Sequence, residues 1–432
     1  MLKECVKIVA FSEGSLSAAA AASRISTTAG DALTAFGKSG NREKDLKLVG
    51  KVLSSGHNTV IEHAWFTLAF NDVSVLAEQA MIEHRLAAYT VKSRRYVNFS
   101  GAGYLVPEGM NEEKQAAYQA HMDRLFSDYT RLTELGVPCE DARFVLPYCF
   151  RSNFIMSVNA RELSQVVGEM TSGRLSVYPE LRRLGEQLKT QLEECFPGVM
   201  NAYVKPAFPP EALPRTEKIN DPAPARQETL LAFAPEDPEA ILNTAMAFNG
   251  HESLTYKQLV RSERPRELEM LNYTFRVNDV SLACVTHFTR HRIQSLLVPA
   301  VVKALEKNAY VLPDTIRQNP QALEIYTAAF RDNAEAARAF LGDTEVLPYF
   351  ALAGNTVDLL FGMNARELRH FLRLRTCTRA QWEIRASARE MLALLVENFR
   401  DLFRHYGPSC AVLGYCPEGR LSCGRIQKSE EN

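Results

Sequence analysis

Short runs that alternate apolar and polar residues are followed along the chain by longer segments with helical spacing. The run from Ala64 to Phe70 predicts a half-buried strand, and the helix after it is predicted to begin near Asp72, a favourable N-cap. Apolar residues then recur every three or four positions in Glu112 to Leu135 and in Asn159 to Phe196, which predicts long helices. Strands and helices in this arrangement indicate the α+β class.

The same pattern occurs a second time. FNDVS at 70–74 is echoed 207 residues later by VNDVS at 277–281, and NAREL at 159–163 recurs identically at 364–368. Further matches between these two keep the same order, so the chain is predicted to contain two diverged copies of one domain. The elements expected in the second copy are a strand at Leu271 to Val277, a helix from Asp279, and helices at Gln321 to Leu341 and Asn364 to Tyr406.

The two copies are separated by a proline-rich segment that lacks apolar periodicity. We predict an extended linker at residues 205–228, between a first domain at 1–204 and a second at 229–432. Aligning the Gly-His pairs at 56–57 and 250–251 requires an insertion of about 13 residues in the second copy, predicted as a loop or short helix at Lys257 to Glu269. The length of 432 residues suits two domains of about 200 residues each.

The overall charge is balanced. The chain has 50 Lys and Arg against 51 Asp and Glu, so we expect neither nucleic acid nor an anionic membrane as a partner. Its apolar stretches are too short to cross a bilayer, and its first residues lack the apolar core of a cleavable signal. The nine cysteines are too sparse and irregular for a disulfide framework, which predicts a reduced cytoplasmic protein.

Two polar motifs in the second copy carry candidate chemistry. Arg290, His291 and Arg292 place two guanidinium groups and an imidazole within one helical turn, which could bind pyrophosphate or a flavin ring. A solvated helix end is the other interpretation of that triplet. The second motif is longer, with NARELRHFLRLR at 364–375 and AQWEIR at 380–385.

Together these motifs resemble the two hallmarks of the flavin-dependent thymidylate synthases, the ThyX family, and the resemblance extends over nearly the whole chain. It implies two tandem ThyX-like domains, each a small antiparallel sheet with long helices. It also implies reductive methylation of dUMP to dTMP, with methylenetetrahydrofolate as the one-carbon donor and NADPH reducing FAD. Since the family assembles four domains, a homodimer of this tandem chain is expected to mimic that tetramer.

Neither copy keeps the complete substrate hallmark. The first copy has Glu83 where the leading arginine belongs but keeps Ser93, Arg95 and Tyr96, which are implied to bind the phosphate and sugar. The second copy keeps the leading Arg290 and has LVPAVV in place of those residues. The catalytic Arg375, expected to stabilise negative charge on the uracil, is Met170 in the first copy. Complementary losses imply hybrid sites built from both copies. The substrate-binding residues implied by the resemblance are Ser93, Arg95, Tyr96, Arg143 and Arg375.

The flavin site is implied mainly by the second copy. His370 belongs to it, and its counterpart in the first copy is Gln165. Thr59 matches a flavin-binding position but has a structural interpretation as well, and Arg366 could be a paired surface charge. The cofactor-binding residues implied by the resemblance are Thr59, Arg290, His291, Arg292, Ser295, Asn364, Arg366 and His370.

The C-terminal segment contains candidate metal ligands. His405, Cys410, Cys416 and Cys423 could form a tetrahedral zinc site, although their spacing lacks paired C-x2-C knuckles, so free or partly buried thiols are the alternative. The other cysteines considered, Cys139, Cys149, Cys284 and Cys377, are predicted to be small buried residues.

Two alternative functions remain open at the level of the sequence. One is a catalytically silent flavin- or nucleotide-binding homologue, favoured by Glu83, by LVPAVV, and by Val91 where an acidic residue is usual. The other is C5-methylation of a different pyrimidine nucleotide, because the contacts to phosphate and base are the most altered.

Overall fold

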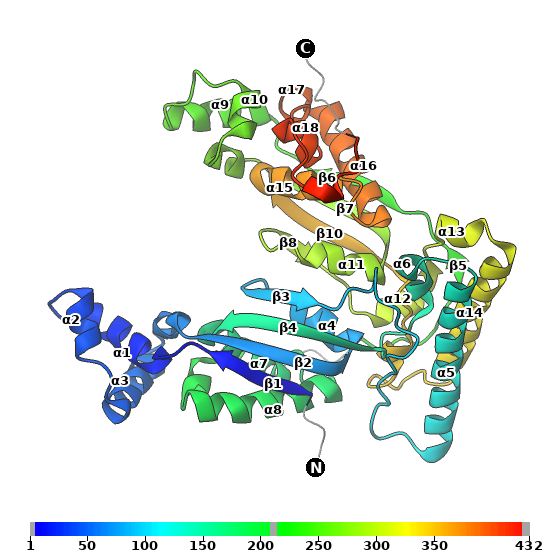
Figure 1. Ribbon diagram of the computed structural model, residues 1–432, viewed down its shortest axis with the longest axis horizontal. Coiled ribbons are helices and arrows are strands. Elements are labelled where there is room, and N and C mark those ends of the chain that lie inside the picture. Colours follow the sequence, from blue (N-terminus) through cyan, green and yellow to red (C-terminus); the bar gives the residue numbers. More distant parts are fainter. Residues whose placement is uncertain (1–4, 208–213, 426–432) are drawn as a thin grey trace. The chain divides into compact units, whose positions relative to one another are not determined.

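The computed structural model describes residues 5–207 and 214–425, which form two compact units (Figure 1). Unit 1 comprises Met1–Asn220 and Pro313–Ala353, and unit 2 comprises Asp221–Leu312 and Gly354–Asn432. Each unit contains one antiparallel four-stranded sheet with helices, so the predicted α+β class is confirmed. The segment 313–353 belongs to the second copy by sequence but packs within unit 1.

The sheet of unit 1 has the strand order β1-β2-β4-β3. Its strands are β1 (Val6–Phe11), β2 (Trp65–Ser74), β4 (Arg151–Asn159) and β3 (Ala87–Val91). Alternate residues of β2 are buried, as the period of a strand requires, and they face α7 and α8, which lie along one face of the sheet (Figure 1). The hydrophobic core of the unit lies between these two layers.

The helices of unit 1 include the alanine-rich α1 and the long pair α5 and α14, which pack together through a His121 Nε2 to Asn333 Oδ1 hydrogen bond of 2.9 Å. Their bounds are α1 (Ser15–Ile25), α2 (Ala32–Gly37), α3 (Arg42–Ser54), α4 (Val75–Ile82), α5 (Glu112–Glu134), α6 (Cys139–Ala142), α7 (Ala160–Ser172), α8 (Pro179–Cys195), α13 (Asp314–Arg317) and α14 (Pro320–Arg338), with 3-10 turns η1 (Asn58–His63), η2 (Arg143–Val145), η3 (Val199–Ala202) and η5 (Leu347–Phe350).

The sheet of unit 2 repeats this topology in the order β6-β7-β10-β8. Its strands are β6 (Glu228–Phe233), β7 (Asn272–Ser281), β10 (Thr356–Asn364) and β8 (Ser295–Leu297), and β5 (Ala223–Pro224) pairs in parallel with β9 (Ala309–Tyr310). The helices are α9 (Pro238–Phe248), α10 (Tyr256–Arg261), α11 (Leu282–Thr289), α12 (Val302–Lys307), α15 (Ala365–Arg375), α16 (Trp382–Asn398), α17 (Arg400–Phe403) and α18 (Ser409–Leu413), with 3-10 turns η4 (Arg266–Met270) and η6 (Gly419–Leu421).

Several predicted elements agree with the structure to within a few residues, among them α5 and α14. The segments 159–196 and 364–406, predicted from their helical spacing, are mainly helical, and each is divided into separate helices. In the first copy, the backbone N–H of Gly173 caps α7, and Pro179 then starts α8 at a position where a missing N–H is harmless. The predicted insertion contains most of α10 and most of η4, and a loop or short helix was expected there.

The predicted N-caps Asp72 and Asp279 are wrong. Both residues have a left-handed backbone, with φ of 53° and 58°, where β2 and β7 change register against their neighbouring strands. The strands continue to Ser74 and Ser281, and the hydroxyl oxygens of these serines cap the following helices. Aspartate tolerates the left-handed region better than most residues, so it suits the bulge position, and the serine takes the place of the cap.

Part of the predicted linker, residues 208–213, lies outside the described residues. In the remainder, β5 forms within unit 2 and β6 begins at Glu228, so the end of this segment belongs to the fold. None of the helices in the described parts of the chain has both the length and the apolarity needed to cross a membrane.

Candidate functional site

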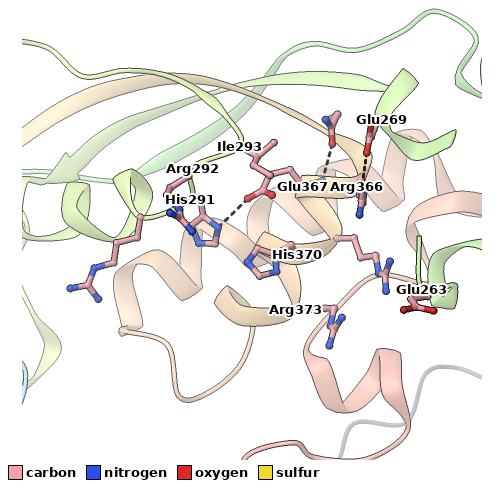
Figure 2. A pocket seen from close by; sticks show the side chains of 12 residues that line it. Glu263, Glu269, His291, Arg292, Ile293, Arg366, Glu367, His370 and Arg373 are labelled. Carbon is pink, nitrogen blue, oxygen red and sulfur yellow. Dashed lines mark hydrogen bonds and ion pairs between the residues drawn. The ribbon is translucent and has the colours of Figure 1, made fainter. Parts of the chain in front are cut away.

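A basic cleft of about 600 Å³ lies in unit 2 (Figure 2). Its walls come from the segment before β7, the residues that follow α11, and helix α15 with its N-cap. Five arginines and two histidines face three glutamates, so the cleft suits an anionic ligand. The lining residues are Glu263, Glu269, Arg290, His291, Arg292, Ile293, Asn364, Arg366, Glu367, Arg369, His370 and Arg373.

Helix α15 presents its polar face to this cleft. Asn364 caps the helix, because its side-chain oxygen accepts the Glu367 N–H at 2.8 Å. Leu368, Phe371 and Leu372 are buried on the opposite face. The cleft-lining residues that share the spacing i, i+3, i+4 and i+7 are Arg366, Arg369, His370 and Arg373.

A buried chain of contacts, Glu367 to His291 to Arg375, adjoins the cleft and is called the relay below. His291 follows the C-cap of α11 and is 4% exposed. Its Nδ1 lies 3.3 Å from Glu367 Oε1, and its Nε2 accepts a hydrogen bond from Arg375 Nε at 2.9 Å. Since Nε2 is the acceptor, the ring proton lies on Nδ1 and points to the Glu367 carboxylate.

Burial sets the charge of this relay. It lowers the pKa of His291 to about 2, with Arg375 and then His370 adding to the effect, so the imidazole is neutral. Burial also raises the pKa of Glu367 to about 7. A neutral imidazole can sit against the Arg375 guanidinium without repulsion. His291 is therefore suited to orient Arg375.

The predicted catalytic Arg375 is not one of the residues that line the cleft. It is half-buried at the end of α15, where Nε donates to His291 and one terminal nitrogen donates to the His287 carbonyl at 3.3 Å. Through His291 and Glu367 it is nevertheless connected to the cleft wall.

The other predicted flavin residues of unit 2 occupy different places. Arg290, the C-cap of α11, and Arg292 line the cleft as exposed residues. Arg366 lines it as well and forms an ion pair with Glu269. Ser295 does not line the cleft, because it lies at the start of β8, paired with Gly362.

The predicted phosphate residues of unit 1 gather around one acidic residue. Arg95 forms an ion pair with the Glu140 carboxylate, and Arg143 Nε donates to the Glu140 carbonyl at 2.9 Å. The Ser93 hydroxyl accepts the Arg95 backbone N–H at 3.3 Å, while the Tyr96 ring is 68% exposed beside the Arg95 guanidinium. Thr59, the remaining predicted residue of unit 1, is exposed in η1.

In the first copy, the counterpart of the cleft is covered by the chain itself. The positions of His370 and Arg373 are occupied there by Gln165 and Gly168. Gln165 Nε2 donates to the Ala202 carbonyl at 2.8 Å, and its Oε1 accepts the Val204 N–H. A side chain on Gly168 would come within 2.2 Å of the Tyr203 ring. The aromatic ring therefore packs where the second copy has an arginine.

The structure does not gather the predicted zinc ligands. Across 5–207 and 214–425, no three His, Cys, Asp or Glu side chains are placed to hold a metal ion. Cys410 and Cys416 are half-buried and Cys423 is exposed, which agrees with the alternative of free thiols. Of the cysteines predicted to be buried, Cys149 and Cys284 are buried, whereas Cys139 and Cys377 are half-buried.

Three functional candidates were not singled out from the sequence. Glu367 is the acidic residue of the NAREL motif, and Arg369 and Arg373 follow it in the same helix. The spacing of Arg369 and Arg373 from Arg366 places the three on one helix face, and this could have been recognised in the sequence. Burial of Glu367 next to His291 depends on the packing of α15 against the end of α11, which spacing alone does not give.

Comparison with known proteins gives matches to both copies. The family model described as thymidylate synthase complementing protein matches residues 7–198 and 229–399. The flavin-dependent thymidylate synthase of Geobacter sulfurreducens is 38% identical over 122 residues, which are 27% of this chain and 53% of that relative. The flavin-dependent thymidylate synthase of Nitratidesulfovibrio vulgaris is 35% identical over 184 residues, which are 39% of this chain and 74% of that relative.

A solved structure is similar as well. The flavin-dependent thymidylate synthase ThyX from Helicobacter pylori, complexed with FAD and dUMP, matches 46% of this chain and 99% of its own, at 21% identity and a TM-score of 0.37. The two regions matched by the family model contain the two antiparallel sheets of the structure. This chain therefore belongs to the flavin-dependent thymidylate synthase family and carries two copies of the family's domain in tandem.

Proposed function

We propose that this protein is a flavin-dependent thymidylate synthase that converts dUMP to dTMP with methylenetetrahydrofolate, using NADPH as reductant and FAD as cofactor. The observation that carries the proposal is the basic cleft of the second copy, together with the Glu367, His291 and Arg375 relay beside it. The relatives named above carry the same activity in their names.

The cleft fits the cofactor by size and by charge. About 600 Å³ accommodates a substantial part of a dinucleotide, and the positive charge of the cleft suits an anionic cofactor. FAD would supply the redox chemistry of the reaction, while the protein supplies position and charge. The residues proposed to hold FAD from this unit are Arg290, His291, Arg292, Asn364, Arg366 and His370.

Arg375 is proposed to meet the pyrimidine. A guanidinium against a uracil carbonyl stabilises the negative charge that develops as C5 becomes nucleophilic, and this effect is large only when the cation is preorganised. The imidazole of His291 and the carbonyl of His287 both help to orient Arg375. Glu367 in turn keeps the proton of His291 on Nδ1, so that Nε2 remains an acceptor for Arg375.

The phosphate of the nucleotide is proposed to bind Ser93, Arg95 and Arg143 of the first copy, with Tyr96 beside the sugar. Support comes from the contacts of Arg95 and Arg143 with Glu140, where an arriving phosphate dianion would compete for the Arg95 guanidinium. Since Arg375 belongs to the second copy, we propose hybrid sites in a homodimer of tandem chains. The retention of complementary residues by the two copies is the reason for this proposal.

The test is thymidylate formation by the purified protein with FAD, NADPH, methylenetetrahydrofolate and dUMP. Arg143→Ala in the first copy and Arg375→Ala in the second should each reduce turnover on the order of 100-fold or more, because each removes charge from the same site. Exposed Arg389→Ala is the matched control and should leave turnover unchanged. Loss of activity in Arg375→Ala alone would contradict the hybrid site.

Flavin binding without product would instead favour the silent binding homologue, whose supporting observation is the covered cleft of the first copy. Replacing dUMP by other uridine nucleotides in the same assay tests the third candidate, C5-methylation of a different pyrimidine nucleotide. Product formed only from such a nucleotide would identify it as the substrate.

A further inference from the structure

Arg369 and Arg373 are two cations of the cleft that the proposed flavin set does not use. They lie one turn apart on α15, so both side chains project from the same face of the helix. The Nε atom of each is buried and has no hydrogen-bond partner among the described residues. The cleft thus holds two guanidinium groups, one helical turn apart, whose Nε donors are buried and unmatched within 5–207 and 214–425.

Such an arrangement is unfavourable without a ligand. A buried donor that lacks a partner costs about 1–3 kcal/mol, and two neighbouring guanidinium groups repel each other. Burial, followed by Arg373, lowers the pKa of Arg369. An anion that accepts hydrogen bonds from both arginines would relieve the desolvation and the repulsion together, and a phosphate oxygen group matches the guanidinium fork in geometry.

The position of the pair along the helix indicates the size of the ligand. Figure 2 shows His370 between His291 and Arg373. From Glu367 to Arg373 the helix rises by roughly 9 Å, at 1.5 Å per residue. A molecule that contacts His291 at one end and this arginine pair at the other is extended, as a dinucleotide is.

The first copy lacks both cations. Ser164 and Gly168 occupy the corresponding positions, and the Tyr203 ring covers Gly168. The arginine pair therefore occurs in the copy whose cleft is open and is absent where the cleft is covered, which associates the pair with a ligand and not with the stability of the shared fold.

We propose that Arg369 and Arg373 form a phosphate-binding subsite of the cleft, which takes the phosphate group of a dinucleotide. Two sources share this chemistry: the pyrophosphate of the flavin dinucleotide, and a phosphate of the nicotinamide dinucleotide that reduces it. The choice between these sources rests on the proposed function, whereas the phosphate subsite itself does not.

The first experiment uses inorganic pyrophosphate as the probe, titrated calorimetrically into the full-length protein without flavin. The double variant Arg369→Gln/Arg373→Gln should bind pyrophosphate at least about 10-fold more weakly, since each charge-assisted hydrogen bond is worth more than a neutral one. Arg389→Gln on α16 removes one exposed positive charge of the same unit and should bind as the wild type does. Equal affinity of the double variant and the wild type would overturn the proposal.

A second variant guards against misfolding. Arg369→Lys/Arg373→Lys keeps the charge but loses the bidentate fork, so its affinity should lie between those of the wild type and the glutamine variant. A lysine variant as weak as the glutamine variant, together with altered circular dichroism in both, would assign the loss to the fold and overturn the subsite.

The final arms distinguish the two sources. If the flavin provides the phosphate, the glutamine double variant weakens FAD binding and leaves riboflavin binding unchanged. If the nicotinamide dinucleotide provides it, FAD binding is kept while the preference of the reduction step for NADPH over NADH falls. Arginine-dependent pyrophosphate binding by a protein that binds no flavin would retain the subsite and remove the proposed function.

Discussion

Arg375 is held by the His291 imidazole and by the His287 carbonyl, which makes its guanidinium a preorganised cation. We expect Arg375→Gln to lower thymidylate turnover on the order of 100-fold or more, because the charge opposite the uracil carbonyl is lost. FAD affinity should stay within a few-fold, since Arg375 does not line the cleft. Stopped-flow turnover with parallel flavin titration measures both quantities, and full turnover in the variant would remove the catalytic role of Arg375.

The buried imidazole of His291 gives the protein a defined response to acid. Its pKa is lowered to about 2 in the folded chain, so between that pH and its ordinary pKa near 6.5 the unfolded chain binds a proton that the folded chain does not. Stability from this group is present above pH 6.5 and is lost as the pH falls through that value, by about 1.4 kcal/mol between pH 7.5 and pH 5.5.

We therefore expect His291→Gln to show a smaller loss of unfolding free energy between pH 7.5 and pH 5.5 than the wild type. Urea unfolding at both pH values measures the difference. Glu367 remains in both proteins, so the contribution of its raised pKa largely cancels in the comparison. An equal loss of unfolding free energy in the two proteins would show that His291 takes up a proton in the folded state.

At the scale of elements, the same join of strand and helix is built twice. Ser74 caps α4, and its backbone N–H donates to the buried Glu180 carboxylate at 2.8 Å. Ser281 caps α11 in the same way, and its backbone N–H donates to the buried Glu383 carboxylate at 2.7 Å. In the second copy this join places the end of α11, and hence His291, at the wall of the cleft. The bulge before each serine sets where the helix begins.

Substitutions at Asp72 test the bulge directly, because this residue has the left-handed backbone of the bulge, with φ of 53°. Asp72→Val should destabilise unit 1 by about 1–2 kcal/mol more than Asp72→Asn, since a β-branched side chain is strained in the left-handed region and asparagine is not. Thermal unfolding of the two variants against the wild type provides the measurement. Equal losses in both variants would mean that the carboxylate, and not the backbone conformation, stabilises the bulge.

At the scale of the whole molecule, the covered counterpart in the first copy sets the number of cofactors. We expect one FAD per chain at saturation, because Tyr203 and the hydrogen bonds of Gln165 occupy the corresponding region of the first copy. Flavin absorbance against protein concentration, after removal of unbound FAD, gives the ratio. A ratio of two would show that the Tyr203 segment leaves that region when flavin binds.

The sequence by itself determined the tandem repeat, the α+β class, the family and half of the residues that line the cleft. These features depend on local order along the chain, namely motif spacing and apolar periodicity. It also predicted the bounds of α5 and α14 closely, because an amphipathic pattern of that length is compatible with a helix and not with a strand.

Only the tertiary structure decided which residues meet. Asp72 became a bulge residue because strand register depends on the neighbouring strand, and the helices at 159–196 and 364–406 were divided by packing that periodicity does not record. Glu367 became the partner of His291 across 76 positions of sequence, and burial then fixed the protonation of both. Desolvation arises from what surrounds a side chain in space, so the chemistry of the site follows from the fold.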